Sequence, residues 1–316
     1  MQRVAAALLA AIVFIVFGAA YARAQPSDGR TPGELAVAVE RRAAATSFAE
    51  LEAFGRAAMT RRDREGLNRL YHVTWIILNQ GEFEQAGIWN ARLAAAARGQ
   101  NDARYIAIAH LNDLTIRYDR GETAAADEMA RIAADASDWF VKAHAARLTA
   151  LALMDQDRIG DGLRLVSDAD ALVPDVDPYA ATARAGLWEM AGIGLMKLND
   201  IEGATTAFGR FEIDFNNPAY PRPDFDALYN LTRLSVQVGD LPMAERLYAA
   251  HHRLAQRAAI ESLSVYDANL CAMVAAAREA PHDVLACLSP FGVDLGPASF
   301  LAPHLLPARA IAYAQT

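Results

Sequence analysis

The fold is decided by the stretch from Trp188 to Phe211, which reads WEMAGIGLMKLNDIEGATTAFGRF. Apolar residues recur every three to four positions on either side of a short polar turn at Asn199 and Asp200, as they do in amphipathic helices. Asn accepts the backbone conformation that ends a helix, and Asp favours the start of the next helix through the helix dipole. A small residue, Ala204, stands where the second helix would cross the first. The stretch therefore predicts two packed helices joined by a tight turn.

The same pattern returns along the chain. Comparable turns begin at Gly81, Gly121, Asp157 and Gly239, a weaker one begins at Thr46, and a further one is expected near Ala280. Turns about 35 to 42 residues apart are typical of helical solenoids, in which each pair of helices buries its apolar face against the next pair. The chain is 53% hydrophobic and rich in alanine, the best helix former. We therefore expect an all-α repeat domain.

The stretch around Trp188 resembles a unit of the tetratricopeptide repeat (TPR) family. Its matching positions are Trp188, Ala191, Gly192 and Leu195 in the first helix and Ala204, Phe208 and Phe211 in the second. The Gly239 unit matches through Leu228, Leu231, Ala244 and Tyr248, and the Gly81 unit matches through Leu70, Val73, Ile77, Ala86 and Leu93. The resemblance implies a right-handed α-α superhelix, a TPR-like solenoid of about six to seven helix pairs over residues 34–316. The long period resembles the variety found in bacterial regulators and in the extracytoplasmic sensor halves of GGDEF proteins.

Two units depart from the family's pattern. In the Gly121 unit, His110, Asp113 and Arg117 stand where apolar residues are expected, which predicts a shifted register. The Asp157 unit is degenerate.

The segments between units and the end of the chain carry further expectations. Two proline-rich segments, residues 173–178 and 216–223, fall between units and are not expected to divide domains, because proline commonly follows a helix end. The chain stops at Thr316, about where the turn of another unit would fall. We therefore expect the repeat domain to end within a repeat, as part of a longer protein or as a gene product cut short.

The N-terminus predicts export. A short basic start precedes an uncharged apolar stretch from Val4 to Ala20, and Ala22-Arg23-Ala24 supplies a small-x-small cleavage site. This pattern is typical of a secretory signal peptide over residues 1–24, followed by a flexible leader over 25–33. We expect cleavage after Ala24 and a periplasmic protein; a single uncleaved N-terminal anchor is the alternative. The net charge of −8 disfavours nucleic acid and anionic lipid as partners.

Motifs that carry chemistry are missing from the sequence. It contains no zinc-protease, nucleophile-elbow, phosphate-loop or dinucleotide-binding motif. His251 and His252 are adjacent, so we expect their side chains to diverge on a helix and to be solvated rather than to bind a metal. We expect no catalysis, no cofactor and no metal. An enzyme on a helical solenoid would need converging carboxylates, for which only Glu189 and Asp226 stand out, in different units.

Two cysteines lie at equal distances from an expected turn. Cys271 and Cys287 are each eight residues from Glu279, so antiparallel helices would place them level with each other. A disulfide would then stabilise the last helix pair by roughly 3 kcal/mol in an oxidising compartment. Two buried free thiols are the alternative.

Groove residues follow from the resemblance, since the first helix of each TPR unit lines a concave groove. The strongest candidates are Tyr71, Trp75, His144, Arg147, Glu189, Tyr229 and Arg233. Asn68, Asn79, Asp155, Lys197 and Asp226 occupy further groove positions. Aromatic and arginine side chains often anchor interfaces, so these residues would hold an extended peptide or the terminus of a partner. Alternatively, they pack against a neighbouring unit or pair with carboxylates.

Two functions follow from these expectations. The first is an exported scaffold that binds a protein or peptide through its concave face, without catalysis. The alternative is the extracytoplasmic sensor domain of a membrane signalling protein of the GGDEF diguanylate cyclase type, whose output part is missing from this chain.

Overall fold

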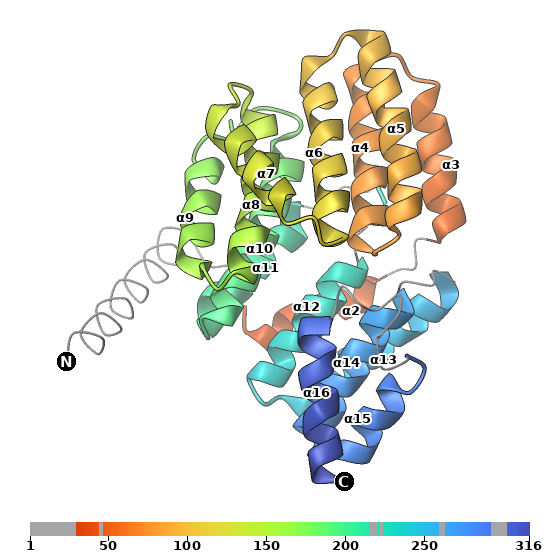
Figure 1. Ribbon diagram of the computed structural model, residues 1–316, viewed down its shortest axis with the longest axis vertical. Coiled ribbons are helices and arrows are strands. Elements are labelled where there is room, and N and C mark those ends of the chain that lie inside the picture. Colours follow the sequence, from red (N-terminus) through yellow and green to blue (C-terminus); the bar gives the residue numbers. More distant parts are fainter. Residues whose placement is uncertain (1–29, 44–46, 215–219, 222–223, 259–262, 292–301) are drawn as a thin grey trace, which may run out of the picture. The chain divides into compact units, whose positions relative to one another are not determined.

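The computed structural model describes residues 30–43, 47–214, 220–221, 224–258, 263–291 and 302–316, and within them the protein is all-helical (Figure 1). The helices are α2 (Pro32–Arg42), α3 (Phe48–Met59), α4 (Arg64–Asn79), α5 (Phe83–Gln100), α6 (Ala103–Asp119), α7 (Ala124–Asp135), α8 (Trp139–Asp155), α9 (Ile159–Asp170), α10 (Ala180–Lys197), α11 (Ile201–Asp214), α12 (Asp224–Gln237), α13 (Leu241–Ala258), α14 (Leu263–Ala277), α15 (Pro281–Leu288) and α16 (Ala302–Gln315). The expected signal peptide lies outside the described residues, and so does Thr46. Helix α2 begins at Pro32, inside the segment expected to be a flexible leader. No helix in the described part of the chain has the length and apolar character needed to cross a membrane.

The predicted turns are confirmed by the backbone. A positive φ occurs at Gly81, Gly121, Asp157, Asn199 and Gly239, each at the start of a predicted turn, and also at Glu279 beside the turn expected near Ala280. The left-handed conformation lets the last carbonyl groups of one helix be satisfied before the next helix begins. Asn101, at the end of α5, has the same conformation, with a φ of 59°. This turn was not predicted, because it joins one repeat to the next rather than the two helices of one repeat.

We call the helix before each predicted turn a first helix and the helix after it a second helix. Helix pairs α4–α5, α8–α9, α10–α11, α12–α13 and α14–α15 each pack together across their turn. The Gly121 unit differs: α6 packs on α4 and α5, and α7 packs on α8. His110 and Asp113 of α6 are exposed, whereas Tyr105, Ile108 and Leu111 are buried, so its apolar face is rotated from the expected positions.

First and second helices differ in how they are buried. All residues from Leu70 to Leu78 of α4, from Ala143 to Ala150 of α8, and from Ala185 to Gly192 of α10 are buried. The second helix α9 buries only one stripe, which includes Leu163 and Val166. A helix that is apolar around its circumference belongs in the interior, and one with a single apolar stripe belongs at the surface.

Small residues allow the close approach of paired helices. A Cβ atom on Gly192 of α10 would lie 2.5 Å from the Phe208 ring of α11, and one on Gly194 would lie 2.7 Å from the Met154 side chain. Ala204, predicted as a crossing residue, is fully buried. Close packing of this kind leaves no room for an added methyl group without a shift of the neighbours.

The chain divides into two compact units. The central unit (Glu122–Asn217) holds α7 to α11, and the discontinuous unit (Pro32–Gly121 with Pro218–Thr316) holds α2 to α6 and α12 to α16. One boundary between the two compact units therefore falls within the proline-rich segment 216–223, where the sequence predicts only a link between repeats. In the discontinuous unit, α2 packs on α12 and α13, and Arg246 pairs with Glu40 at 2.6 Å.

Helices α14, α15 and α16 share a small core within the discontinuous unit. Val265, Val284, Leu288 and Leu305 are buried there together. A disulfide joins Cys271 of α14 to Cys287 of α15, with their Cα atoms 5.8 Å apart. The two cysteines thus lie level across the turn at Glu279, as the equal spacing implied.

Candidate functional site

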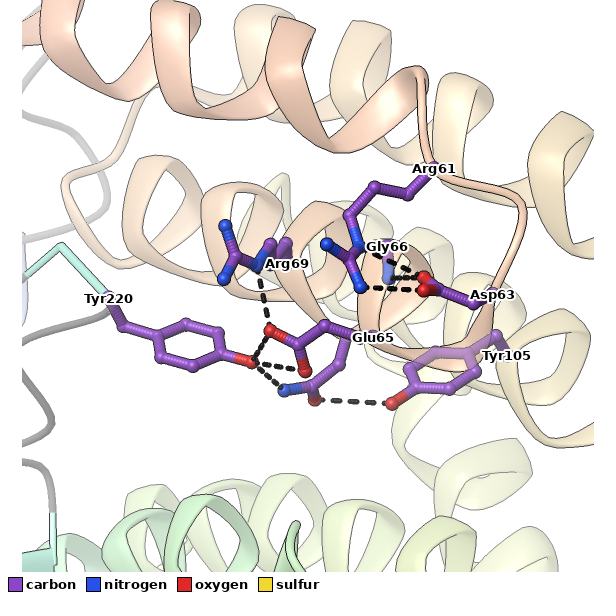
Figure 2. A network of polar contacts seen from close by, with 8 residues as sticks. Arg61, Asp63, Glu65, Gly66, Arg69, Tyr105 and Tyr220 are labelled. Atoms are coloured by element: carbon purple, nitrogen blue, oxygen red, sulfur yellow. Dashed lines mark hydrogen bonds and ion pairs between the residues drawn. The ribbon is translucent and has the colours of Figure 1, made fainter.

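Helix α4 begins at a rigid polar corner. Asp63 caps it, and its Oδ1 accepts a hydrogen bond of 2.8 Å from the backbone N–H of Gly66. The Arg61 guanidinium binds the same carboxylate through two hydrogen bonds of 3.0 and 2.6 Å, and holds the pKa of Asp63 below its usual value (Figure 2). A Cβ atom on Gly66 would lie 2.7 Å from the Arg61 Cβ, so this corner requires glycine. The corner fixes the direction in which the first turn of α4 presents its side chains.

The first turns of α4 bind a tyrosine that lies 152 residues away in the sequence. The Tyr220 hydroxyl donates to the Glu65 carboxylate, with both oxygens at 2.9 Å, and accepts a hydrogen bond of 2.8 Å from Asn68 Nδ2. Asn68 Oδ1 in turn accepts from the Tyr105 hydroxyl of α6 at 3.1 Å, and Arg69 Nε donates to Glu65 at 2.7 Å. Figure 2 shows the Tyr220 hydroxyl and the Arg69 side chain both directed at the Glu65 carboxylate. The hydrogen bonds run in one direction, from Tyr105 through Asn68 and Tyr220 to the Glu65 carboxylate, so they polarise one another in the same sense.

Aromatic and cationic groups surround the Tyr220 ring. Its centroid lies 4.9 Å from the His72 ring in an edge contact and 5.8 Å from the Phe54 ring of α3. The Arg69 guanidinium lies over both rings, 5.7 Å from the Tyr220 centroid and 5.2 Å from that of Phe54. Burial, together with the hydrogen bond to Glu65, raises the pKa of Tyr220 to about 12, so the phenol is neutral and remains a donor. We call the surface formed by Phe54, Glu65, Asn68, Arg69 and His72 the tyrosine site.

The tyrosine site also holds the backbone of the residue after Tyr220. His72 Nε2 donates a hydrogen bond of 3.0 Å to the carbonyl oxygen of Pro221. Burial lowers the pKa of His72 to about 4, so at neutral pH the imidazole is uncharged and donates from Nε2. One side chain and one carbonyl of the 220–221 segment are therefore recognised by α3 and α4.

The groove residues predicted on α4 are inside the protein. Tyr71 and Trp75 are 5% and 4% exposed, so neither offers a surface to a partner in this structure. Two secondary candidates have partners from a distant part of the chain: Asn68 binds Tyr220, and Asn79 Nδ2 donates to Asp226 of α12 at 3.4 Å. The physical reason for the burial of Tyr71 and Trp75 is that α4 is covered around its circumference.

Three predicted groove residues of the central unit, His144, Arg147 and Glu189, are buried as well, whereas Asp155 and Lys197 are exposed. Arg147 of α8 and Glu189 of α10 form an ion pair with 3.6 Å between Nη2 and Oε2, and their side chains are 7% and 6% exposed. Burial raises the pKa of Glu189, and Arg147 partly opposes that rise. His144, also buried, has its pKa lowered to about 3 by burial and by the nearby Arg147 charge. Lys197 donates to the Met154 carbonyl at 2.9 Å and lies 3.8 Å from Asp155.

Tyr229 and Arg233 of α12 lie together at the edge of the interior. Both are half-buried, and the Arg233 guanidinium lies 5.5 Å from the centroid of the Tyr229 ring. The Tyr229 hydroxyl accepts a hydrogen bond from Asn269 of α14, and its ring meets Tyr266 edge-on at 5.4 Å. These contacts join α12 to α14, which agrees with the alternative that such residues pack against a neighbouring unit.

The two adjacent histidines of α13 do not diverge into solvent as expected. His251 Nδ1 lies 3.2 Å from one oxygen of Asp267, and His252 Nδ1 lies 2.5 Å from the other. His251 is only 1% exposed. Side chains of consecutive helical residues point about 100° apart, but α14 packs on α13 and its Asp267 carboxylate lies against both rings. The described residues hold no group of three or more such side chains arranged to bind a metal ion.

The residue that sequence reasoning missed is Tyr220. It was treated as part of a linker, because the motif of paired helices contains no place for it. The signal was present, since a tyrosine flanked by Pro218, Pro221 and Pro223 is an aromatic anchor in a segment otherwise suited to a spacer. Aromatic residues in such segments need a hydrophobic or hydrogen-bonded seat when they are not solvated.

Comparison with known proteins identifies no relative: no family model, no curated protein and no solved structure matches the chain.

Proposed function

We propose that this protein is an exported scaffold of the TPR-like kind, a right-handed superhelix of helix pairs that binds a protein or peptide and carries out no catalysis. The regular helix pairs, each turning at a residue with positive φ, support the repeat architecture. The basic start, apolar stretch and Ala-x-Ala site at residues 1–24 support export to the periplasm.

The observation that carries the binding function is the contact between α4 and the 220–221 segment. A first helix binds a non-helical segment through a side-chain hydroxyl and a backbone carbonyl, which is how a groove binds an extended peptide. Tyr71 and Trp75 are buried, so we place the binding surface at the tyrosine site, at the start of α4. Contact at the predicted positions His144, Arg147 and Glu189 of α8 and α10 would require helices to separate, because these side chains are buried.

Site-specific photocrosslinking in living cells tests this function. The photoreactive residue p-benzoylphenylalanine replaces Phe54, whose ring lies beside Tyr220, in the full chain with and without Tyr220→Ala. A matched control places it at Ile88, which is 41% exposed on the second helix α5 of the same unit. We expect an adduct with a partner protein from position 54 and none from position 88, in the periplasmic fraction.

Two patterns of crosslinking would contradict the proposed binding face. If neither background gives an adduct at position 54, or if position 88 gives the same adducts, α3 and α4 do not form a binding face. Recovery of the full chain in the cytoplasm, with residues 1–24 attached, would contradict export.

A further inference from the structure

We propose that the 220–221 segment is an internal ligand of the tyrosine site, and that the site's external ligand is an extended peptide in which tyrosine precedes proline. The partner would bind by displacing Tyr220, so the free protein is self-inhibited. This inference rests on the proposed scaffold function and adds the chemistry of its ligand.

The tyrosine site recognises the hydroxyl group of Tyr220 through both of its hydrogen-bonding roles. The hydroxyl donates to Glu65 and accepts from Asn68. A phenylalanine in its place would leave the Asn68 amide and the Glu65 carboxylate without this partner, and sites built to bind a hydroxyl reject analogues that lack it. A phosphorylated tyrosine would bring its charge against the Glu65 carboxylate and would also be rejected. The chemistry therefore selects an unmodified tyrosine.

Proline after tyrosine suits the second contact. His72 donates to the carbonyl oxygen of Pro221, and this contact does not need the backbone N–H that proline lacks. Proline also biases the preceding residue toward extended backbone, so less conformational freedom is lost when such a peptide binds.

The internal segment is attached in a way that permits exchange. Tyr220 is only partly buried, and neither it nor Pro221 belongs to a helix; α12 begins at Asp224. The 220–221 segment is bound through one side chain and one backbone carbonyl, whereas α12 packs separately against α2, α13 and α14. A tethered ligand acts at an effective concentration of about a millimolar, so it excludes weak free peptides without needing high intrinsic affinity. Removal of the Tyr220 side chain should therefore open the site while α12 remains packed.

Peptide binding to the full mature chain tests the inference. The probe is the fluorescently labelled peptide Pro-Ala-Tyr-Pro, the protein's own sequence at 218–221, measured by anisotropy against wild type, Tyr220→Phe and Tyr220→Ala. We expect Tyr220→Ala to bind it at least ten-fold more tightly than wild type, with Tyr220→Phe between them. Pro-Ala-Phe-Pro and the phosphotyrosine peptide should each bind Tyr220→Ala at least ten-fold more weakly, and adding Glu65→Ala should remove the preference for tyrosine over phenylalanine.

A matched control is Tyr313→Ala, which removes a tyrosine that is 66% exposed and should leave peptide binding unchanged. The inference is overturned if Tyr220→Ala melts cooperatively and binds no more tightly than wild type, or if it binds the phenylalanine peptide equally well. If Tyr220→Ala does not fold, the same comparison between wild type and Tyr220→Phe decides. If position 54 gives an adduct with a partner protein but the Tyr-Pro peptide does not bind, the scaffold function is supported and only the proposed Tyr-Pro ligand is contradicted.

Discussion

The polar interiors of the two units are built differently. In the discontinuous unit, the polar side chains on α4 are joined by hydrogen bonds of 2.7 to 3.1 Å that end on one carboxylate, and the segment carrying Tyr220 completes them. In the central unit, Arg147 and Glu189 face each other from α8 and α10 at 3.6 Å, and both are buried. The first arrangement depends on a non-helical segment, and the second depends only on two packed helices.

The difference shows what each polar group contributes. Burial removes the hydration of both charges, and this cost cancels much of their mutual attraction. The Arg147–Glu189 pair therefore adds little net stability, but the loss of either partner would leave the other charge buried without its counter-ion. Tyr220, by contrast, is only partly buried, and we propose that its hydrogen bonds exchange for those of another tyrosine. Under that proposal the central unit is a structural support and the discontinuous unit holds the binding site.

The largest expected effect comes from breaking the ion pair of the central unit. Glu189→Ala leaves the Arg147 charge buried without its carboxylate, and should lower the free energy of unfolding by about 3 to 5 kcal/mol. Urea denaturation followed by circular dichroism measures this loss. The double variant Arg147→Met/Glu189→Met removes both charges and should be more stable than Glu189→Ala; equal losses would mean that the pair is not electrostatically coupled.

Acid should weaken both units through their buried histidines. The folded pKa is about 4 for His72 and about 3 for His144, whereas the unfolded value is about 6.5. Both rings are neutral at pH 7 in either state. Below pH 6.5 the unfolded chain takes up protons that the folded chain does not, so the free energy of unfolding falls until the folded pKa is reached. Between pH 7 and pH 4.5 each histidine should account for a loss of about 2 to 3 kcal/mol in the free energy of unfolding.

Glutamine variants separate these contributions from other groups. The raised pKa of Glu189 acts in the opposite sense, because the folded protein then takes up a proton more readily than the unfolded chain. Denaturation curves at pH 7 and pH 4.5 for wild type, His72→Gln and His144→Gln isolate each ring. An unchanged pH dependence in both variants would contradict the assignment of acid sensitivity to these two residues.

A smaller effect is expected at the tyrosine site. Tyr220→Phe keeps the ring among Phe54, Arg69 and His72 but removes the hydroxyl from Glu65 and Asn68, which should cost about 1 to 2 kcal/mol. Tyr313→Phe, at an exposed position, should change stability by less than about 0.5 kcal/mol. Thermal melts of the two variants measure the difference, and equal melting temperatures would show that the hydroxyl contributes nothing to folding.

Local patterns were predictable from the sequence, and their long-range partners were not. The turns at Gly81, Asn199 and Gly239 followed from short-range chemistry, because a residue that tolerates positive φ is needed wherever two helices meet tightly. The all-helical class followed from the same periodicity. The placement of α2 on α12 and α13, and of Tyr220 on α4, joins residues far apart in the chain, for which periodicity carries no information.

The groove residues illustrate the same limit. Family positions correctly placed Tyr71, Arg147 and Glu189 on first helices, but the resemblance implied that one face of those helices is open. The apolar composition of α8 and α10 around their full circumference was the available sign that they are interior helices. Asn68 and Asn79 are groove positions that a distant segment of the chain does reach, through hydrogen bonds with Tyr220 and Asp226.

The environment of the Tyr220 ring gives the most direct test of a self-occupied site on α4. Fluorine NMR of the mature chain with 3-fluorotyrosine at position 220, and separately at position 313, reports that environment in solution. We predict that the 220 resonance is distinct from the 313 resonance, and that millimolar Pro-Ala-Tyr-Pro moves it to the position of an exposed tyrosine while the 313 resonance stays. A 220 resonance that matches exposed tyrosine without peptide, or that does not move when the peptide is bound, would contradict the proposal that Tyr220 occupies the ligand's place.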